Sequence, residues 1–367
     1  MLELLRQALR KSLYIVREEG IRTWMTRATR IGIVKTRRAF QDKRVNLQRW
    51  SELRGRFHGQ RAFIVGNGPS LNDTPMHLLK GEHVICFNRF HLMFERLAWR
   101  PDMYAVSDDR VAFDIADELV QEVLPEVDYA FFPDIHPFNV DFRTIIPARD
   151  NVYWMYLDRL DFSDELPYAG MNKTVANVAV QVLAYLGFNP IYLIGVDMSY
   201  ARPQSVSEVN ARDWTSTADD DPNHFDPRYF GQGRKYHNPR IDETRERYLR
   251  ARDFFNARGV EIVNAGVGGE LDVFPRVPFR SLFGEIDAAS ELELLREAVD
   301  SSDSGVPGAE IDRLPRGTNN VSHGGMWIDQ DAFRNAMPDL LRTHLVFGPT
   351  ATSDYLAVVR ASGPAWG

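Results

Sequence analysis

The sequence predicts an α/β protein with a doubly wound, mostly parallel Rossmann-like sheet, a helical N-terminal arm and a small C-terminal appendage. From about residue 58 onward, short apolar runs alternate with helix-length segments, as in a sheet assembled from β-α-β units. The apolar runs end in glycine or polar residues, and a parallel sheet collects these strand ends at one rim, where ligands bind. The composition changes at both ends of the chain, which predicts the arm and the appendage.

The expected elements follow in order along the central part of the chain. The strands are expected at 62–66, 83–88, 102–108, 129–133, 152–157, 190–197 and 260–266, and the long helices at 173–187 and 243–259. Helix-length segments separate these short apolar runs, which favours a doubly wound sheet. Domain boundaries are accordingly expected at 51–285 for the sheet domain, 286–325 for a Ser/Gly/Pro-rich linker and 326–367 for the appendage, whose role no motif indicates.

The arm, residues 1–50, is strongly basic. It contains 13 Lys and Arg residues against four acids, a net charge of +9, whereas the whole chain carries −7. Two interpretations follow: residues 1–45 bind an anionic membrane surface, or the arm packs on its own domain or on a second subunit of a homo-oligomer. Apolar residues recur every three or four positions, as on an amphipathic helix: Leu2, Leu5, Leu9, Leu13 and Val16.

Bulk composition excludes several classes of protein. The net charge of −7 argues against nucleic-acid binding by the chain as a whole. A single cysteine, Cys86, excludes an internal disulfide framework and a CxxC zinc site. No run of about 18 apolar residues occurs, so we expect no membrane-spanning helix. A cytoplasmic protein, peripheral on the inner membrane face if the arm binds lipid, is the expectation.

The stretch RAFIVGNGPSLN, residues 61–72, places a corner with few side chains at the end of the first strand. Gly66 and Gly68 lack a Cβ, so backbone N–H groups there can approach a ligand closely. Pro69 suits the first turn of a following helix, and Ser70 can cap its free amides. A phosphate or diphosphate suits this corner, although it matches neither GxGxxG nor a Walker loop. A tight structural turn is the alternative.

Polar residues also follow the other strands at the same rim. Asn88 and Arg89 follow the second strand, and Asp197 follows the strand at 190–197. Each has a structural alternative, capping for Asn88 and Asp197 and an ion pair for Arg89. The adjacent Asp108 and Asp109 leave two interpretations: they hold Mg²⁺ that bridges phosphates, or they are solvated or capping carboxylates.

Four blocks of the chain, in this order, resemble a known family over about residues 58–285. They are similar to MptE-like proteins, a group that includes archaeal hydroxymethylpterin diphosphokinases and flagellin-modifying Maf glycosyltransferases, and to bacterial CMP-sialic acid-dependent sialyltransferases. The blocks are FIVGNGPSLN with VICFNRF, KTVANVAVQVLAYLGFNPIYLIGVDMSY, DPNHFDPRYFGQGRKYHNP and LDVFPRVPFRSLF.

The resemblance implies a donor site. In the sialyltransferases, the positions of Asn67, Gly68, Ser70 and Asn88 hold the CMP part of the donor, and the segment of Thr174 contacts donor phosphate and sugar. This chain departs from that pattern, because Ser199 stands where the family has its first phosphate-binding tyrosine, and this leaves the sugar open. The resulting donor candidates are Gly66, Asn67, Gly68, Pro69, Ser70, Asn88, Arg89, Thr174, Asp197, Ser199, Tyr200 and Tyr229.

The resemblance also implies a catalytic histidine shortly before a helix. His237 takes that place when the chain is aligned without gaps, and His224 in the NHF block is the rival. A histidine suits this task because its ordinary pKa, near 6.5, lets it accept a proton at neutral pH. Arg89, Arg234 or Lys235 could stabilise the negative charge on a departing phosphate.

Together these features predict a sialyltransferase-like glycosyltransferase in surface-polysaccharide biosynthesis. It transfers a sugar from a nucleotide-activated, CMP-linked donor to a glycan, glycolipid or protein acceptor, and requires no cofactor in principle. An ATP- and Mg²⁺-dependent pterin-type diphosphokinase using Asp108 and Asp109 is the first alternative. A non-catalytic nucleotide-binding scaffold in polysaccharide assembly is the second.

Overall fold

The structure, a computed structural model, describes residues 9, 12–13, 16–17, 20–38, 43–135, 141–159, 161–208, 213–237, 240–284, 326–329, 345–346 and 355–358. The expected linker 286–325 lies outside these residues. The chain divides into two compact units. Unit 1 comprises Met1–Ile64, Asp102–Ile191 and Arg240–Ile262, and unit 2 comprises Val65–Pro101, Tyr192–Pro239 and Val263–Gly367. The expected domain 51–285 contributes residues to both.

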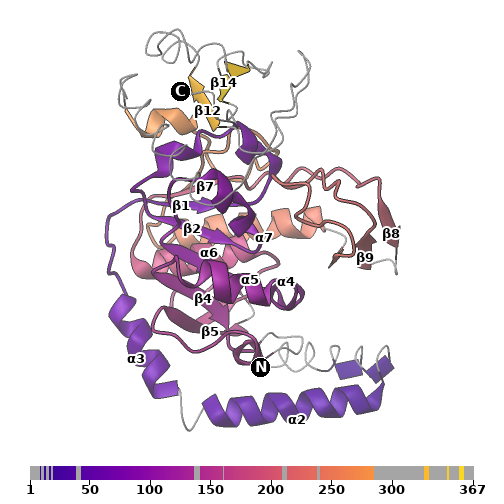
Figure 1. The fold of residues 1–367 in the computed structure, drawn as a ribbon. Coiled ribbons are helices and arrows are strands. Elements are labelled where there is room, and N and C mark those ends of the chain that lie inside the picture. The colour runs from indigo at the N-terminus through magenta and orange to yellow at the C-terminus, as the bar shows by residue number, and fades with distance from the viewer. Residues whose placement is uncertain are drawn as a thin grey trace, which may run out of the picture. The chain divides into compact units, whose positions relative to one another are not determined.

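One sheet of eight strands forms the centre of the fold, in the order β11-β7-β1-β2-β3-β4-β5-β6 (Figure 1). The strands β3, β4, β5 and β6 run parallel to one another. Every residue of β1 and β2 is buried. The strand bounds are β1 Ala62–Val65, β2 Val84–Phe87, β3 Met103–Ala105, β4 Tyr129–Pro133, β5 Val152–Arg159, β6 Tyr168–Gly170, β7 Ile191–Ile194 and β11 Ile262–Asn264.

The strand order confirms the doubly wound fold. The chain runs outward from β1 to β6, then returns to the opposite side of β1 for β7 and β11. The N–H of Ala62 bonds to the carbonyl of Pro190, and the N–H of Gly66 to that of Ile194, so β7 runs parallel to β1. The connections that leave β1 and β7 diverge, and this makes the carboxyl ends of these two strands the topological switch point, where such sheets bind ligands.

The helices within the described residues follow the predicted order, with shorter pieces between the strands. The α-helices are α2 Ile21–Arg37, α3 Lys43–Leu53, α4 Asp109–Asp114, α5 Ala116–Glu118, α6 Val175–Leu186 and α7 Ile241–Asn256. The short 3₁₀ helices are Pro69–Asp73, Met76–Leu79, Phe90–Arg96, Phe142–Thr144 and Phe279–Leu282, and Leu119–Val123 is a π-helical turn.

The helix α6 shows how local chemistry sets its bounds. Thr174 caps its start, since the Thr174 hydroxyl accepts the N–H of Ala176 at 3.3 Å. Gly187 ends it at a φ of 95°, a left-handed conformation that glycine adopts without strain. Nearly every residue between the caps is buried, which explains why this segment is apolar on all sides.

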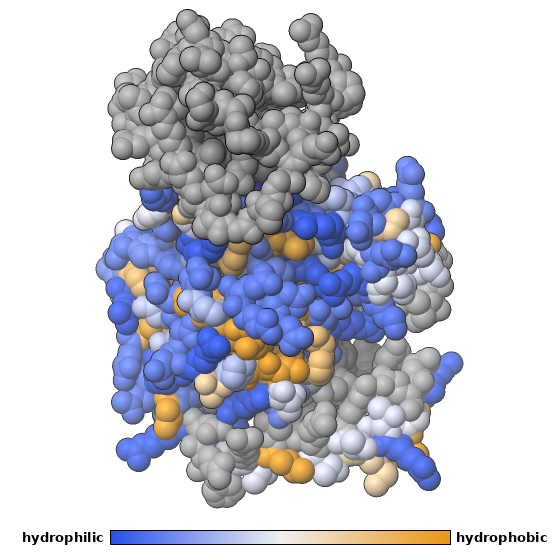
Figure 2. Space-filling model, in the orientation of Figure 1, coloured by the Kyte–Doolittle hydropathy of each residue, from blue (hydrophilic) through white to orange (hydrophobic). Residues whose placement is uncertain are grey.

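The N-terminal helices α2 and α3 differ in their surroundings. The helix α3 packs on β5 of unit 1: the Trp50 indole and the Asn46 amide both donate to the carbonyl oxygen of Trp154. By contrast, α2 leaves apolar side chains in solvent, such as Ile33, which is 62% exposed. Figure 2 shows hydrophobic atoms among hydrophilic ones along the bottom of the view, where α2 lies. Within the described residues, no helix combines the length and hydropathy needed to cross a bilayer.

Two small antiparallel sheets complete the fold and were not predicted. The first, in unit 2, has the order β10-β9-β8, with β8 Val206–Glu208, β9 Asp213–Ser216 and β10 Lys235–His237. The second has the order β12-β14-β13, with β12 Met326–Asp329, β13 Leu345–Val346 and β14 Tyr355–Val358, inside the expected appendage. These strands have two to four residues each, too few for a periodicity of two to stand out in the sequence.

Candidate functional site

The carboxyl ends of β1 and β7 meet in unit 2 at the switch point of the sheet. Three backbone or side-chain donors of the corner after β1 bond to the loop after β7. The Gly68 N–H bonds to the carbonyl of Gly195 at 2.8 Å. Ser70 donates its N–H and its hydroxyl to the two carboxylate oxygens of Asp197, at 2.9 and 2.5 Å. The donors that were expected to hold a phosphate therefore bond to oxygens of this chain.

The two glycines of the corner are explained by the same contact. A Cβ added to Gly68 would lie 2.3 Å from an Asp197 carboxylate oxygen, and one added to Gly66 would lie 2.1 Å from the carbonyl oxygen of Gly195. Neither distance is sterically allowed. Close approach of the backbone is thus required, as predicted, and in this structure the group that approaches is the Asp197 loop.

The segment after the corner differs from the expected helix. It is a 3₁₀ helix of five residues, Pro69–Asp73, and no side chain caps it. The Ser70 hydroxyl donates a hydrogen bond to Asp197 and does not cap a free amide of this helix. So short a helix has almost no macrodipole, which removes the expected positive end. The nearby Asp73 also lies close to Asp197, and burial together with that charge raises the pKa of Asp73.

A long loop of unit 2, residues 217–234, packs against the same corner. The N–H of Phe225 bonds to the carbonyl of Asn67 at 3.0 Å, and the Asn72 amide donates to the carbonyl of Phe225 at 3.0 Å. The Asn67 side chain donates to the carbonyl of Phe87 at the end of β2. These bonds place His224, the residue before Phe225, beside the strand ends of β1 and β2.

His224 is paired with a carboxylate that the sequence did not single out. Its Nδ1 lies 2.7 Å from the Oδ2 of Asp221, whose side chain is only 3% exposed. The imidazole stacks on the ring of Tyr229 with 3.8 Å between centroids and 3° between planes. The edge of Phe230 closes another side. The ring is therefore fixed in position and keeps 22% of its side-chain surface exposed.

The Asp-Pro-Asn-His order of this loop contains the signal for Asp221. The Asp221 carboxylate accepts the N–H of Asn223 at 2.9 Å, two residues on, which is the bond of an Asx turn. Such a turn brings the fourth residue back towards the first, so that Asp221 and His224 meet. From the sequence, the histidine of this motif was predicted as a site residue, and the acid three residues before it was not.

The donor candidates Asn88, Arg89 and Tyr229 lie together beneath this histidine. Tyr229 is buried and hydrogen-bonds to the Asn88 side chain, and burial raises the pKa of its phenol. Asn88 has a φ of 57°, uncommon outside glycine. Arg89 is 2% exposed, and its charge acts on both Tyr229 and His91.

Tyr200 and Ser199 follow Asp197 on the loop after β7. Both are partly exposed. The Tyr200 hydroxyl is buried and has no hydrogen-bond partner among the described residues. Its ring faces Trp214 of β9, and burial raises the pKa of the phenol, to which the charge of Asp221 adds. A buried hydroxyl in this state is a donor available to a ligand.

Four of the remaining candidates are placed as follows. His237 belongs to β10, where its backbone pairs with Asp213, and its side chain lies outside the described residues. Thr174 caps α6 in unit 1. Asp108, also in unit 1, caps α4 by accepting the N–H groups of Arg110 and Val111, and Asp109 is the first residue of that helix. Among the described residues, no three His, Cys, Asp or Glu side chains are grouped as metal ligands.

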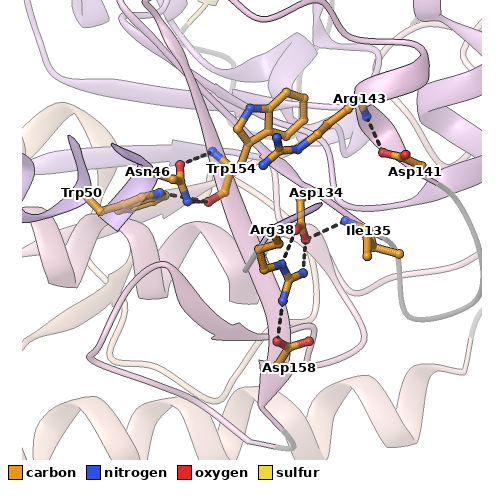
Figure 3. Close-up of polar contacts among 9 residues, drawn as sticks. All are labelled: Arg38, Asn46, Trp50, Asp134, Ile135, Asp141, Arg143, Trp154 and Asp158. Atoms are coloured by element: carbon orange, nitrogen blue, oxygen red, sulfur yellow. Dashed lines mark hydrogen bonds and ion pairs between the residues drawn. The ribbon is translucent and has the colours of Figure 1, made fainter. Parts of the chain in front are cut away.

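Unit 1 contains a second buried polar cluster, which the sequence did not predict (Figure 3). Arg38 donates to both carboxylate oxygens of Asp134, the residue after β4, and to Asp158 of β5 at 2.8 Å. Asp134 is 0% exposed and also accepts the N–H of Ile135 at 2.7 Å. The guanidinium lies 4.0 Å above the ring of Tyr156. Each nitrogen of the guanidinium donates one hydrogen bond to a carboxylate of this chain. Arg38 belongs to the expected arm, and in the structure it is part of unit 1.

Three comparisons with known proteins bear on this chain. No curated protein matches it. Among solved structures, a chain described as "Structure of MAf glycosyltransferase from Magnetospirillum magneticum AMB-1" is similar at 18% sequence identity and a TM-score of 0.40. That similarity covers 70% of this chain and 41% of the other, so this protein spans less than half the length of that chain.

A family model described as "6-hydroxymethylpterin diphosphokinase MptE-like" matches residues 39–203. The match begins just after Arg38, includes β1 to β7, and ends after Tyr200. The blocks at 221–239 and 271–283, which contributed to the predicted resemblance, lie beyond it. Over residues 39–203 the chain is therefore similar to the MptE-like family, the resemblance that its motifs predicted.

Proposed function

We propose that this protein is a glycosyltransferase that takes a sugar from a nucleotide-activated donor, with a CMP-linked donor as the first choice. His224 is the base that removes the proton from the acceptor hydroxyl. The observation that supports this best is the His224–Asp221 pair, 2.7 Å apart, beside the carboxyl ends of β1 and β2. One imidazole nitrogen faces a buried carboxylate, which leaves the other for the acceptor.

The chemistry of such a transfer suits these groups. Charge develops on the departing phosphate and a proton must leave the acceptor hydroxyl. A positioned histidine contributes about 10²- to 10⁴-fold to such a step. Arg89 supplies positive charge in a buried setting, where it acts strongly, and the Tyr200 hydroxyl is a donor for a phosphate oxygen.

The acceptor is a glycan, glycolipid or protein, and α2 is proposed to bring the enzyme to an anionic membrane surface on the cytoplasmic side. The helix has five Lys and Arg residues and no acid among its 17 residues. Ile21, Met25 and Ile33, spaced by four and eight residues, are each more than half exposed. Apolar groups on one face and cations around them favour the interface of anionic lipid.

The diphosphokinase is the second candidate, because the matching family is described by that activity. It also deprotonates a hydroxyl, so the same histidine would serve it. Mg²⁺ and ATP would be required, with Asp108 and Asp109 as the proposed ligands. Asp108 would then have to give up the N–H groups that it accepts as the cap of α4.

Calorimetry and turnover measurements on wild type, His224→Ala and His237→Ala distinguish these functions. We expect wild type to bind CMP without metal, and His224→Ala to bind CMP equally well while its turnover of CMP-sialic acid falls at least a hundredfold. His237→Ala is the matched control and should stay near wild type. Binding of ATP only with Mg²⁺ would favour the kinase, and binding of neither nucleotide at millimolar concentration would favour the scaffold.

A further inference from the structure

Asp221 lies in a position that no motif assigns. Its Oδ1 accepts the N–H of Asn223 at 2.9 Å, and its Oδ2 accepts the N–H of Phe230 at 3.2 Å while facing the Nδ1 of His224 at 2.7 Å. Two backbone donors on a nearly buried carboxylate stabilise its ionised form. An ionised carboxylate offers only acceptors.

The tautomer of His224 follows from this environment. Because Asp221 can only accept, the Nδ1 of His224 must carry the hydrogen, and the Nε2 of the neutral ring is then an unprotonated acceptor. A free imidazole prefers the opposite tautomer, with the hydrogen on Nε2. Stacking on Tyr229 and the edge contact with Phe230 prevent the ring from turning to exchange its nitrogens.

We infer that Asp221 is a positioning residue, which holds His224 in the one tautomer and orientation that can accept a proton at Nε2. The inference rests on the proposed role of His224 as base. In the transfer, the acceptor O–H proton moves to Nε2 and the acceptor oxygen bonds to the activated carbon. The bond from that carbon to the donor phosphate breaks, and its electron pair leaves with the phosphate.

The resulting imidazolium faces the Asp221 carboxylate, which stabilises it. The other charged or titratable groups near the imidazole are Tyr229, against which the ring stacks, and Arg89, whose charge acts on that tyrosine. Tyr200 and Tyr236 face Asp221 from the other side. The Asp220 carboxylate also acts on Tyr236, but the carboxylate that faces the Nδ1 of His224 is that of Asp221.

The test is ¹⁵N NMR of the full chain with labelled histidine, where His224→Gln identifies the His224 signals. We expect wild type to show a protonated Nδ1 and an unprotonated Nε2, and Asp221→Ala to show mainly the Nε2-protonated tautomer. Asp219→Ala is the matched control, because the Asp219 carboxylate accepts the N–H of Gln232 in the same loop and is hydrogen-bonded to no histidine among the described residues. The control should leave the His224 signals unchanged.

Turnover of CMP-sialic acid is the second readout. In Asp221→Ala, kcat should fall about a hundredfold with KM nearly unchanged, and Asp221→Glu should recover part of the loss. Unchanged His224 signals in both Asp221→Ala and the isosteric Asp221→Asn would overturn the inference. If the tautomer changes but His224→Ala retains full turnover, Asp221 still positions the ring, and it is the proposed function that fails.

Discussion

Unit 1 and unit 2 each bury a carboxylate, and the two are neutralised in opposite ways. Asp134 faces the guanidinium of Arg38, which is always charged, donates to both carboxylate oxygens and has a second acid, Asp158, on its other side. Asp221 faces the imidazole of His224, a group that can gain or lose a proton. Only the Nδ1 of that ring faces Asp221, and the Nε2 does not. A buried carboxylate beside a permanent cation holds structure together. Beside a histidine, it prepares a group for proton transfer.

The largest expected effect is on the first of these pairs. Arg38→Ala leaves Asp134 buried without its cation, and we expect the free energy of unfolding to fall by about 3–5 kcal/mol. Arg38→Met combined with Asp134→Asn should recover most of this loss, because it removes both charges. Urea denaturation measures both variants, and Arg22→Ala on the exposed part of α2 is the control. A loss below about 1 kcal/mol in Arg38→Ala would mean that the pair contributes little.

A second prediction concerns His91, which lies near cations, whereas His224 faces a carboxylate. Burial, helped by the charges of Arg89 and Arg234, lowers the pKa of His91 from 6.5 to about 4. Between these pH values the unfolded chain binds a proton that the folded chain does not, so stability is fully present above pH 6.5 and is lost as the pH falls towards 4. The loss should be about 3 kcal/mol.

The measurement for His91 is the free energy of unfolding at several pH values, in wild type and in His91→Gln. Other groups also titrate in this range, and Asp226, whose pKa is lowered by its bonds with Arg228 against the effect of burial, adds a loss at the acid end. The difference between the two proteins isolates His91. Parallel pH curves for wild type and variant would contradict the assignment.

A third prediction concerns Gly68 in the corner after β1, where the lack of a Cβ leaves room for Asp197. Gly68→Ala places a Cβ against Asp197, and we expect a loss of about 1–3 kcal/mol in unfolding free energy from overpacking. In an Asp197→Ala background the same substitution should cost clearly less. If Gly68 serves a bound nucleotide instead, Gly68→Ala would weaken CMP binding in calorimetry while leaving the stability unchanged.

The smallest expected effect on stability is on α2. Ile21→Ser, Met25→Ser and Ile33→Ser act on exposed side chains and should each change the unfolding free energy by no more than about 0.5 kcal/mol. The triple variant should nevertheless lose binding to anionic liposomes in a sedimentation assay. These substitutions test the membrane proposal better than deletion of residues 1–45, which would also remove Arg38. Liposome binding by the triple variant at the wild-type level would remove α2 as the anchor.

Much of the fold could be predicted from local pattern. Short apolar runs such as AFIV and VICF alternate with helix-length segments, and this alternation indicated a doubly wound sheet. The special geometry at Gly66 and Gly68 was likewise visible, because two glycines in a strand-to-helix corner indicate a close approach. The identity of the approaching group was not, since Asp197 lies 127 residues from Ser70.

In the candidate site and the second buried cluster, too, local features could be predicted from the sequence and long-range pairings could not. His224 was one of two histidines left open, and the Asx turn that joins it to Asp221 is a local feature that the sequence contained. The pairing of Arg38 with Asp134, 96 residues apart, left no local trace. Nothing in the local sequence distinguishes Arg38 from the other arginines of the basic arm, and its burial is known only from its contacts with Asp134 and Asp158.

The sequence by itself determined the succession of strands and helices, the points where the backbone must come close to another group, and the similarity of residues 39–203 to the MptE-like family. These depend on the chemistry of neighbouring residues. Only the tertiary structure decided which oxygen fills the corner after β1 and which cation neutralises Asp134. Each of these is a choice of partner between distant segments, and strand order and packing, which no short stretch of residues encodes, make that choice.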